Sequence, residues 1–390
     1  MGKYLIIYWC FCNIYTQKFV CFLLTPTTMQ NEHLDLKNDW LQANNTPYII
    51  AGPCSAETEE QVWSTITGMK DLNINAIRAG IWKPRTRPGG FEGVGEVGLK
   101  WLVEAAAHIK KPTMVEIATP QHLEIALKAG VDMVWIGART TVNPFSVQAI
   151  ADALRGTNIA VLVKNPVNPD LNLWIGALER VNRAGITQIA AIHRGFSSNT
   201  KTIYRNEPNW EIAIELKTRF PNLPLICDPS HICGRTDLLL ETAQHAYNLN
   251  YQGVMIETHC DPKNAWSDAQ QQVTPTELAQ ILTALHQRKP DNTNQKTDEM
   301  LQHFRSEIDV IDQELVNLIA RRLNVVHNIG THKKLHNIAI LQPERWTKVF
   351  KDRLTQSNEL KIDESFVKHF FKMIHHQSIE LQTKIFNNGR

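Results

Sequence analysis

The chain has 390 residues, of which 43% are hydrophobic, and its formal net charge is +2 at pH 7. This length exceeds one ordinary domain and the apolar content supports a large core, so two domains are expected. The near-zero charge and the lack of a basic run argue against a nucleic-acid partner. The seven cysteines are odd in number and lack disulfide-framework spacing, which predicts a reducing, cytoplasmic compartment.

The N-terminal segment differs from the rest of the chain. Residues 1–24 are rich in Tyr, Phe, Ile and Cys, but Lys18 interrupts them, so the segment is too broken to span a membrane. It also lacks the small-residue cleavage site of a signal peptide. Met29 begins an ordinary amphipathic stretch, and we interpret residues 1–28 as upstream read-through or an N-terminal extension.

Between residues 46 and 287, short apolar runs alternate with stretches of helical periodicity. The apolar runs lie at 48–52, 76–79, 113–115, 131–136, 159–163, 188–192, 224–226 and 253–256. The helical stretches lie at 57–70, 98–109, 121–129, 146–154, 171–183, 209–218, 236–248 and 276–286. Strand and helix alternating in this way over residues 29–287 predict a (β/α)8 TIM barrel, and an open doubly wound α/β sheet is the alternative.

Each apolar run ends at or just before a residue that can bind a metal or a phosphate. The residues within or just beyond them are Cys54, Lys83, Arg85, Glu116, Arg139, Lys164, Arg194, His231 and Glu257. An open sheet would gather its chemistry at one switch point, whereas a barrel carries it at the C-terminal ends of many strands. The pattern therefore favours the barrel and places the active site at that face.

One group of these residues has the chemistry of metal ligands. Cys54, His231, Glu257 and Asp268 offer a thiolate, an imidazole and two carboxylates, a mixed set suited to a divalent first-row metal. Taken singly, each has the simpler interpretation of a buried core residue. A shared site is favoured because three of them close strands that neighbour each other in the predicted barrel.

A second group is basic and consists of Arg78, Lys83, Arg85, Arg87, Arg139, Lys164 and Arg194. A single surface Arg or Lys is usually only solvated. Seven at strand ends indicate a substrate, or two, with several negative charges, because Arg binds carboxylate and phosphate oxygens bidentately and Lys supplies a mobile charge.

Seven motifs occur in the chain in order: GPCSAE (52–57), RAGIWKPRTRPGGFEG (78–93), IGAR (136–139), VKNP (163–166), HRGF (193–196), DPSH (228–231) and IETHCDPKNAWSD (256–268). With these motifs the barrel region resembles 3-deoxy-D-arabino-heptulosonate 7-phosphate (DAHP) synthases. The resemblance is to the short-barrel type, which is related to octulosonate 8-phosphate synthases.

The resemblance implies condensation of phosphoenolpyruvate with erythrose 4-phosphate, a transferase reaction on the shikimate pathway to aromatic amino acids. It makes Cys54, His231, Glu257 and Asp268 ligands of a divalent metal (Mn, Fe, Co or Zn). It assigns phosphoenolpyruvate to Arg139, Lys164 and Arg194, with Arg78 and Lys83 nearby, the erythrose phosphate to Arg85 and Thr86, and a proton-donor role to Lys83. Glu116 would orient water or Lys83, or serve only as a salt-bridge partner in the barrel.

The choice of sugar rests on the loop after the second strand. The octulosonate enzymes use arabinose 5-phosphate and typically carry Lys-Ala-Asn-Arg-Ser there, whereas this chain has KPRT. The loop therefore favours erythrose 4-phosphate over an octulosonate synthase-like activity.

After a polar linker at 288–297, residues 298–390 change to a helical period with apolar positions from Leu301 to Ile329. One long helix is predicted, followed by two helices near 344–356 and 363–386, which together form a small all-α domain. On the long helix Arg322 falls on the apolar stripe, where an unpaired arginine is costly. Arg322 and Lys333 lie roughly 20° apart around the helix and Arg305 about 100° away, which predicts a second copy and a homodimer or homotetramer.

This tail resembles the all-helical chorismate mutases, an isomerase family. The matching residues are 301–322, Gly330 with Lys333, QPERW (342–346) and SIELQ (378–382). The resemblance implies that Arg305, Arg322, Lys333, Arg345 and Gln382 bind the carboxylates and ether oxygen of chorismate, with Arg322, Lys333 and Gln382 acting in catalysis. Trp346 and Gln342 replace acidic residues usual in that family.

Three interpretations of the tail therefore stay open. It rearranges chorismate to prephenate, which would make the chain bifunctional, or it senses chorismate or prephenate and regulates the barrel allosterically. In the third, it is only a dimerisation bundle. The ether-oxygen contacts Lys333 and Gln382 favour catalysis, because a pure sensor would not need them.

Overall fold

The computed structural model describes residues 33–37, 40–41, 47–83, 89–199, 202–288 and 295–387, with side chains of the last range described from residue 298. Residues 1–28 and Arg85, Thr86 and Arg87 lie outside these ranges, so their interpretation rests on sequence alone. The chain divides into two compact units, residues 1–290 and 291–390.

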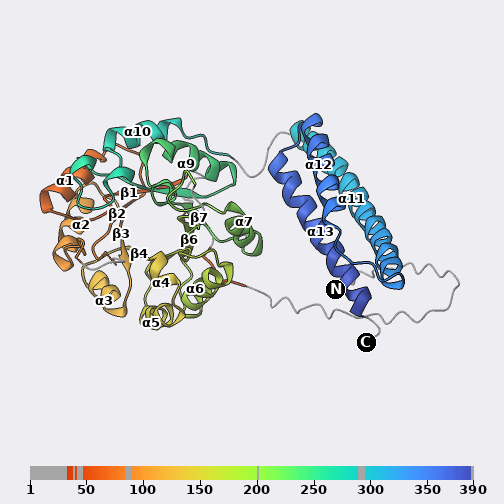
Figure 1. The fold of residues 1–390 in the computed structure, drawn as a ribbon. Helices are drawn as coiled ribbons and strands as arrows, with labels where there is room; N and C mark the ends of the chain where they lie inside the picture. The colour runs from red at the N-terminus through yellow and green to blue at the C-terminus, as the bar shows by residue number, and fades with distance from the viewer. Residues whose placement is uncertain are drawn as a thin grey trace. The chain divides into compact units, whose positions relative to one another are not determined.

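The first unit is a closed barrel of eight parallel strands that neighbour each other in chain order (Figure 1). The strands are β1 (Tyr48–Gly52), β2 (Ala76–Ala79), β3 (Thr113–Ile117), β4 (Met133–Ile136), β5 (Ala160–Lys164), β6 (Ile189–His193), β7 (Leu225–Cys227) and β8 (Gly253–Glu257). The barrel closes between β1 and β8, where Gly52 pairs with Glu257. The predicted TIM barrel is confirmed, and the open sheet is excluded.

Helices surround the barrel (Figure 1). They are α1 (Glu59–Gly68), α2 (Glu96–His108), α3 (Pro120–Lys128), α4 (Ala138–Thr141), α5 (Pro144–Leu154), α6 (Leu171–Arg183), α7 (Trp210–Arg219), α8 (Pro229–Cys233), α9 (Leu239–Asn248) and α10 (Pro275–Ala284). Three 3-10 turns are η1 (Thr236–Leu238), η2 (Pro262–Asn264) and η3 (Ala269–Gln271). Sequence periodicity missed the short α4 and α8, which carry Arg139 and His231, because helices of one turn show no period.

The strands are buried on both faces, as parallel strands covered by helices must be. Their inward side chains fill the barrel with large apolar groups, including Ile50, Met114 and Trp135, and the segment at Trp40 and Leu41 packs against this cluster. The outward side chains pack against the surrounding helices. The interior is therefore solid, and chemistry is left to the ends of the strands.

The second unit consists of α11 (Gln295–Leu335), α12 (Pro343–Glu359) and α13 (Glu364–Asn387). Helix α11 begins within the segment expected as linker. Gly330 allows α13 to approach closely, because a Cβ there would lie 2.9 Å from Ile385 Cδ1 and 3.1 Å from Gln382 Cγ. Along α11 the apolar side chains stay exposed, namely Met300, Leu301, Phe304, Ile308, Val310, Ile311, Leu315, Val316, Leu318, Ile319, Val325 and Ile329.

In the part of the chain that the structure describes, no helix is both long and apolar enough to cross a membrane.

Candidate functional site

The four predicted metal ligands lie at the C-terminal ends of the strands. Cys54 follows β1, Glu257 ends β8, His231 lies on α8 after β7, and Asp268 precedes η3. Cys54 Sγ lies 3.4 Å from Asp268 Oδ2, and His231 Nε2 lies 3.8 Å from Glu257 Oε1. The barrel closure between β1 and β8 thus gathers residues that are more than 200 positions apart in the sequence.

Positive side chains lie between these donors. Arg78, only 2% exposed, donates to the Glu257 carboxylate, and Lys83 Nζ lies 2.9 Å from Cys54 Sγ. Burial, assisted by the charge of Glu257, raises the pKa of the Cys54 thiol to about 12 even though Lys83 lies nearby. Burial alone would raise the pKa of Glu257, but the charges of His231, Arg78 and Lys83 lower it well below its usual range.

A buried carboxylate that the sequence did not single out, Asp228, joins the two predicted groups. Its Oδ2 accepts from Lys164 Nζ at 2.7 Å, and its Oδ1 lies 3.0 Å from His231 Nδ1. Burial opposes ionisation of Asp228, but His231 and Lys164 hold its pKa well below the usual range. A carboxylate that holds Nδ1–H leaves the lone pair of Nε2 free, which is the arrangement of a metal-ligating histidine.

The predicted phosphoenolpyruvate residues follow β4, β5 and β6. Lys164 ends β5 with its ammonium 5.6 Å from the Trp135 ring centroid, and Arg139 is exposed on α4. Arg194 donates to Asn206 Oδ1 at 2.7 Å. Burial lowers the pKa of Arg194 to about 10, with a further contribution from the charges of Arg205 and Arg139, yet it stays a cation at neutral pH. Three cations after neighbouring strands of the barrel favour an anionic ligand.

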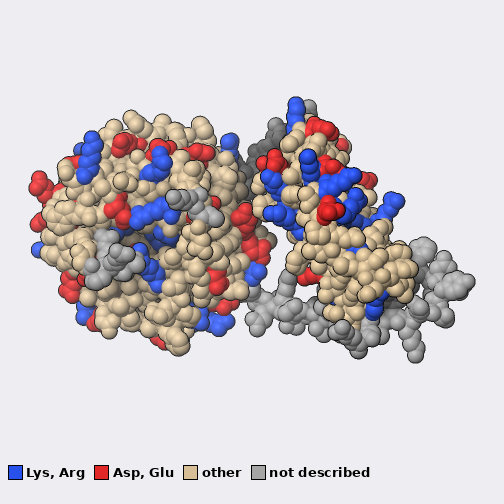
Figure 2. Space-filling view, viewed as in Figure 1, with Lys and Arg blue, Asp and Glu red and all other residues tan. Residues whose placement is uncertain are grey.

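Figure 2 shows Lys and Arg side chains gathered around a hollow near the axis of the barrel. Grey atoms cover part of this face, and the predicted erythrose-phosphate residues Arg85 and Thr86 are among the residues that are not described.

Glu116 is held at the end of β3. Its Oε2 accepts from Trp135 Nε1 at 3.0 Å, and Gly137 leaves room for it, because a Cβ there would lie 2.1 Å from Oε1. Among the described residues Glu116 forms no salt bridge, so its hydrogen-bond partner at the end of β3 is the neutral indole of Trp135.

The loop that carries Asp268 is tied to the rest of the site. Arg205 NH1 donates to Asp268 Oδ1 at 2.9 Å and to Gln271 Oε1 at 2.6 Å. Gln272 Oε1 accepts from the Cys54 N–H at 2.9 Å. Sequence reasoning does not find these partners, because polar residues in loops have no periodic signal and the residues they contact are remote in the chain. They are Asp228, Arg205, Asn206, Gln271, Gln272 and Asn165, whose Oδ1 accepts from the Arg194 N–H at 2.7 Å.

In the helical unit a cavity of about 560 Å³ contains four of the five predicted residues. Arg322, Lys333, Arg345 and Gln382 line it, and Arg322 NH1 donates to Ser378 Oγ at 2.7 Å. Arg322 is exposed in the single chain and is not packed into a core as the apolar stripe suggested. The cavity adds Arg353, Trp346 and His375, and no Asp or Glu is among its described lining residues.

The fifth predicted residue, Arg305, does not line this cavity. It lies on the exposed part of α11, about five turns before Arg322. One copy of the helical unit therefore presents four of the predicted side chains together and leaves Arg305 apart from them.

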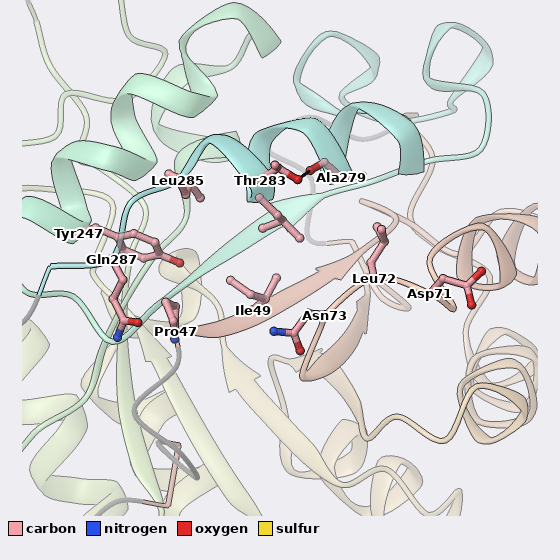
Figure 3. Close-up of a pocket in the computed structure, with 11 residues that line it drawn as sticks. Pro47, Ile49, Asp71, Leu72, Asn73, Tyr247, Ala279, Thr283, Leu285 and Gln287 are labelled. Carbon is pink, nitrogen blue, oxygen red and sulfur yellow. Dashed lines mark hydrogen bonds between the residues drawn. The ribbon is translucent and has the colours of Figure 1, made fainter.

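A separate pocket lies at the opposite end of the barrel strands, beside the start of β1 (Figure 3). Its described lining comprises Pro47, Ile49, Leu72, Tyr247, Leu282 and Leu285, with Asp71, Asn73, Ala279, Thr283 and Gln287. It contains none of the predicted site residues, so a large cavity alone does not locate the chemistry of this barrel.

Comparison with known families agrees with this geometry. Residues 29–293 match the model of the DAHP synthetase I family. The chain belongs to the DAHP synthetase I family. Residues 304–383 match the model for chorismate mutase type II, so the helical tail is related to that family.

Similar individual proteins point the same way. The chain is 32% identical over 227 residues to phospho-2-dehydro-3-deoxyheptonate aldolase of Thermotoga maritima, a match that covers 57% of this chain and 64% of that protein. A crystal structure of that DAHP synthase superposes with a TM-score of 0.56 at 29% identity, covering 62% of this chain and 68% of the other. The helical tail is 31% identical over 80 residues to the T-protein of Haemophilus influenzae, covering 20% of this chain and 21% of that one.

Enzymes named for the octulosonate reaction are also similar to this chain. The 2-dehydro-3-deoxyphosphooctonate aldolase of Dechloromonas aromatica is 25% identical over 239 residues, covering 57% of this chain and 83% of that protein. The lower identity gives no support to an octulosonate synthase over a DAHP synthase.

DAHP synthases generally depend on a metal, and the donor set of this chain fits one by its chemistry. A thiol, an imidazole whose Nδ1 is held by Asp228, and two carboxylates converge at one end of the barrel. As they stand, no three His, Cys, Asp or Glu side chains among the described residues are arranged to hold a metal ion. Arg78 and Lys83 instead provide positive charge between the donors.

Proposed function

We propose that the chain is a bifunctional enzyme of aromatic amino acid biosynthesis. Its barrel condenses phosphoenolpyruvate with erythrose 4-phosphate to DAHP and inorganic phosphate, and its tail rearranges chorismate to prephenate. The observation that carries the barrel assignment is the shared carboxylate of Asp228, which joins Lys164 of the anion-binding group to His231 of the donor group. An anionic substrate is thereby held beside the proposed metal site.

Cys54, His231, Glu257 and Asp268 would hold the divalent metal, which is Mn, Fe, Co or Zn. When bound, such a metal supplies Lewis-acid polarisation of the aldehyde of the sugar phosphate. The rest of the chemistry belongs to the side chains. Arg139, Lys164 and Arg194 bind the phosphate and carboxylate of phosphoenolpyruvate and hold its C3 toward the aldehyde, so that attack becomes effectively unimolecular.

Lys83 is proposed as the proton donor to the oxygen formed from the aldehyde. Burial would lower its pKa, but Cys54 and Glu257 raise it above the ordinary value, so Lys83 keeps its proton at neutral pH. Arg78 compensates Glu257, and Glu116 orients the water that adds to C2 of the condensed intermediate before phosphate leaves. Arg85 and Thr86 are proposed to bind the phosphate of erythrose.

The barrel assignment is tested with purified protein beginning at Met29. Phosphoenolpyruvate consumption is followed with erythrose 4-phosphate and, in parallel, with arabinose 5-phosphate, each with and without a chelator. We expect chelator-sensitive turnover of erythrose 4-phosphate alone. Turnover of arabinose 5-phosphate only would reassign the barrel to the octulosonate reaction, and turnover of neither sugar would refute the synthase.

In the helical unit, Arg322, Arg345 and Lys333 face one cavity and suit the two carboxylates of chorismate. Lys333 and Gln382 are proposed to contact the ether oxygen, where charge develops as the C–O bond breaks. No side chain need react covalently, because the cavity accelerates the rearrangement by holding the compact conformer.

A second copy of the chain is proposed to complete this cavity. Arg305 lies outside it in one copy, while the face of α11 around Ile308 and Ile311 is apolar and exposed. Pairing two such faces would bury apolar area and bring Arg305 of one copy toward the cavity of the other. The chain would then be a homodimer or homotetramer.

Chorismate loss tests the mutase, with Arg322→Ala as the inactive control. One observation favours the alternative of a sensor. Trp346 and Gln342 line the cavity and no acidic residue is among its described lining, so no carboxylate meets the hydroxyl of chorismate. If chorismate persists while chorismate or prephenate slows the barrel reaction, the tail is a regulatory module.

The described cysteines Cys54, Cys227, Cys233 and Cys260 are all unpaired. This supports the proposed reducing, cytoplasmic environment.

A further inference from the structure

The cavity of the helical unit has a wall that the proposed chemistry does not use. On α13, His375 stacks on Trp346 of α12, with ring centroids 3.8 Å apart and an interplanar angle of 13°. Both rings line the cavity. Within the described part of the chain, no hydrogen bond or ion pair of the His375 ring is recorded, so its nitrogens are open to a ligand.

The charges around His375 come from two other helices. Arg322 and Lys333 of α11 and Arg345 and Arg353 of α12 line the same cavity. The other described lining side chains of α13 do not titrate near neutral pH, namely Phe371, Ser378, Ile379 and Gln382. Burial, together with the charge of Arg322, lowers the pKa of His375 below its ordinary value. The imidazole is therefore neutral at pH 7 while the cavity is empty.

A dianion changes this balance. Two carboxylates placed among these cations offset the repulsion by Arg322, which adds to the effect of burial on His375. An opposite charge within about 4–6 Å favours a protonated imidazole by about one to three pKa units. The face of the Trp346 indole also attracts a stacked cation. The carboxylates act only in the complex with the ligand, whereas the Trp346 stack is already present without it.

We propose that His375 is a ligand-contacting residue of the helical cavity, held against Trp346, that takes up a proton when a cyclic dicarboxylate binds. The inference rests on the proposed function of this cavity and deepens it. It gives the cavity a fifth cation that appears with the ligand, at a position that none of the residues predicted from the sequence occupies.

The proposal predicts the direction in which the affinity for the ligand changes with pH. Because the pKa of His375 is higher in the complex than in the free protein, affinity for the dicarboxylate rises as pH falls through the pKa of the complex. The rise ends below the pKa of the free protein, where His375 is charged in both states.

The experiment is calorimetric titration of the full chain with prephenate at pH 7.5, in HEPES and in Tris, which differ in ionisation enthalpy. Carboxylates of the ligand are already ionised at this pH, so any proton taken up goes to the protein. We expect uptake of up to about one proton per ligand in the wild type and none in His375→Gln. The matched control is His376→Gln, because His376 is exposed and pairs with Glu380 instead of facing the cavity.

Equal enthalpies in the two buffers for the wild type, or equal proton uptake in His375→Gln, would overturn the proposal. Should His375→Gln fail to bind, carbon shifts of histidine-labelled wild type with and without prephenate read the charge of the ring directly; a neutral ring in the complex refutes the proposal. Absence of both prephenate binding and chorismate loss would instead refute the proposed function of the tail and the inference with it.

Discussion

Asp228 illustrates how one buried carboxylate can serve two subsites. It is fully buried, its Oδ2 accepts from Lys164, and both of its oxygens lie within about 3 Å of His231 Nδ1. Without it, the ammonium and the imidazole would both lose the partner that fixes their direction. Such outer partners of a metal ligand are as important as the ligand itself.

Replacing Asp228 by Asn keeps the shape of the side chain but removes its charge. We expect divalent metal affinity to fall about 10–100-fold and the phosphoenolpyruvate KM to rise, because His231 and Lys164 are affected together. Metal content by mass spectrometry and steady-state kinetics measure the two effects. Asp237→Asn is the control, since Asp237 pairs with Arg235 at the surface; equal losses in the two variants would contradict the assignment.

His193 makes the stability of the barrel pH-dependent. It is buried between Tyr251 and the Pro208 carbonyl, and burial lowers its pKa to about 4. The unfolded chain, with a histidine pKa of about 6.5, binds more protons between these values, so stability falls as pH drops from about 6.5 to 4. We expect a loss of up to about 3 kcal/mol from this residue.

The measurement for His193 is urea unfolding of the barrel at pH 7 and pH 4.5, compared between wild type and His193→Gln. The variant starts less stable but should lose less stability on acidification. Identical losses in both proteins would show that His193 binds the same number of protons in the folded and unfolded states, against the predicted linkage.

At the scale of elements, helix α10 follows the loop that carries Asp268 and begins with a capping box. Thr274 accepts from the Glu277 N–H, and the Glu277 carboxylate accepts in return from the Thr274 backbone. The box fixes where the loop ends, so it links a local cap to the position of a proposed metal ligand.

Thr274→Ala should destabilise the barrel by about 1 kcal/mol, because it leaves the Glu277 N–H without its partner. Chemical denaturation measures the change. The matched control is Thr283→Ala near the other end of the same helix, where the hydroxyl only bonds Ala279 O. A cost equally large at Thr283 would show that the cap has no special role.

At the scale of the whole molecule, the exposed apolar face of α11 is the feature that one copy leaves unexplained. A row of large apolar side chains of this length is unusual for a monomer and typical of an interface. The helical cavity and Arg305 belong to this question, because a second copy would supply what one copy lacks.

Ile311→Asp should therefore convert the assembly to smaller species and abolish chorismate loss, because it buries a charge in the proposed interface. Sedimentation measures the size and a parallel assay the barrel reaction, which should persist. Glu314→Asp, a neighbouring conservative change on α11, is the control. A wild-type chain that sediments as a monomer would contradict the proposed pairing.

Much of this could be predicted from the sequence because it is locally encoded. Alternating apolar runs and helical periods, repeated eight times, predicted a barrel over an open sheet, and strand ends rich in Arg, Lys, Cys and Glu indicated its active face. The apolar stripe on the long helix after the linker likewise indicated a surface for a partner. Each signal depends on neighbours in the chain, and so it is visible without a structure.

Only the tertiary structure decided which polar residues meet. Barrel closure between β1 and β8 brings Cys54 to Asp268, and Lys164 at the end of β5 reaches past β6 to Asp228 after β7. Packing of α12 on α13 stacks Trp346 on His375. These contacts join residues far apart in the chain, and no local periodicity specifies which loop side chains share a partner. The sequence by itself determined the barrel architecture and the two groups of site residues, the candidate metal ligands and the basic residues. The three-dimensional packing determined which of these side chains contact one another.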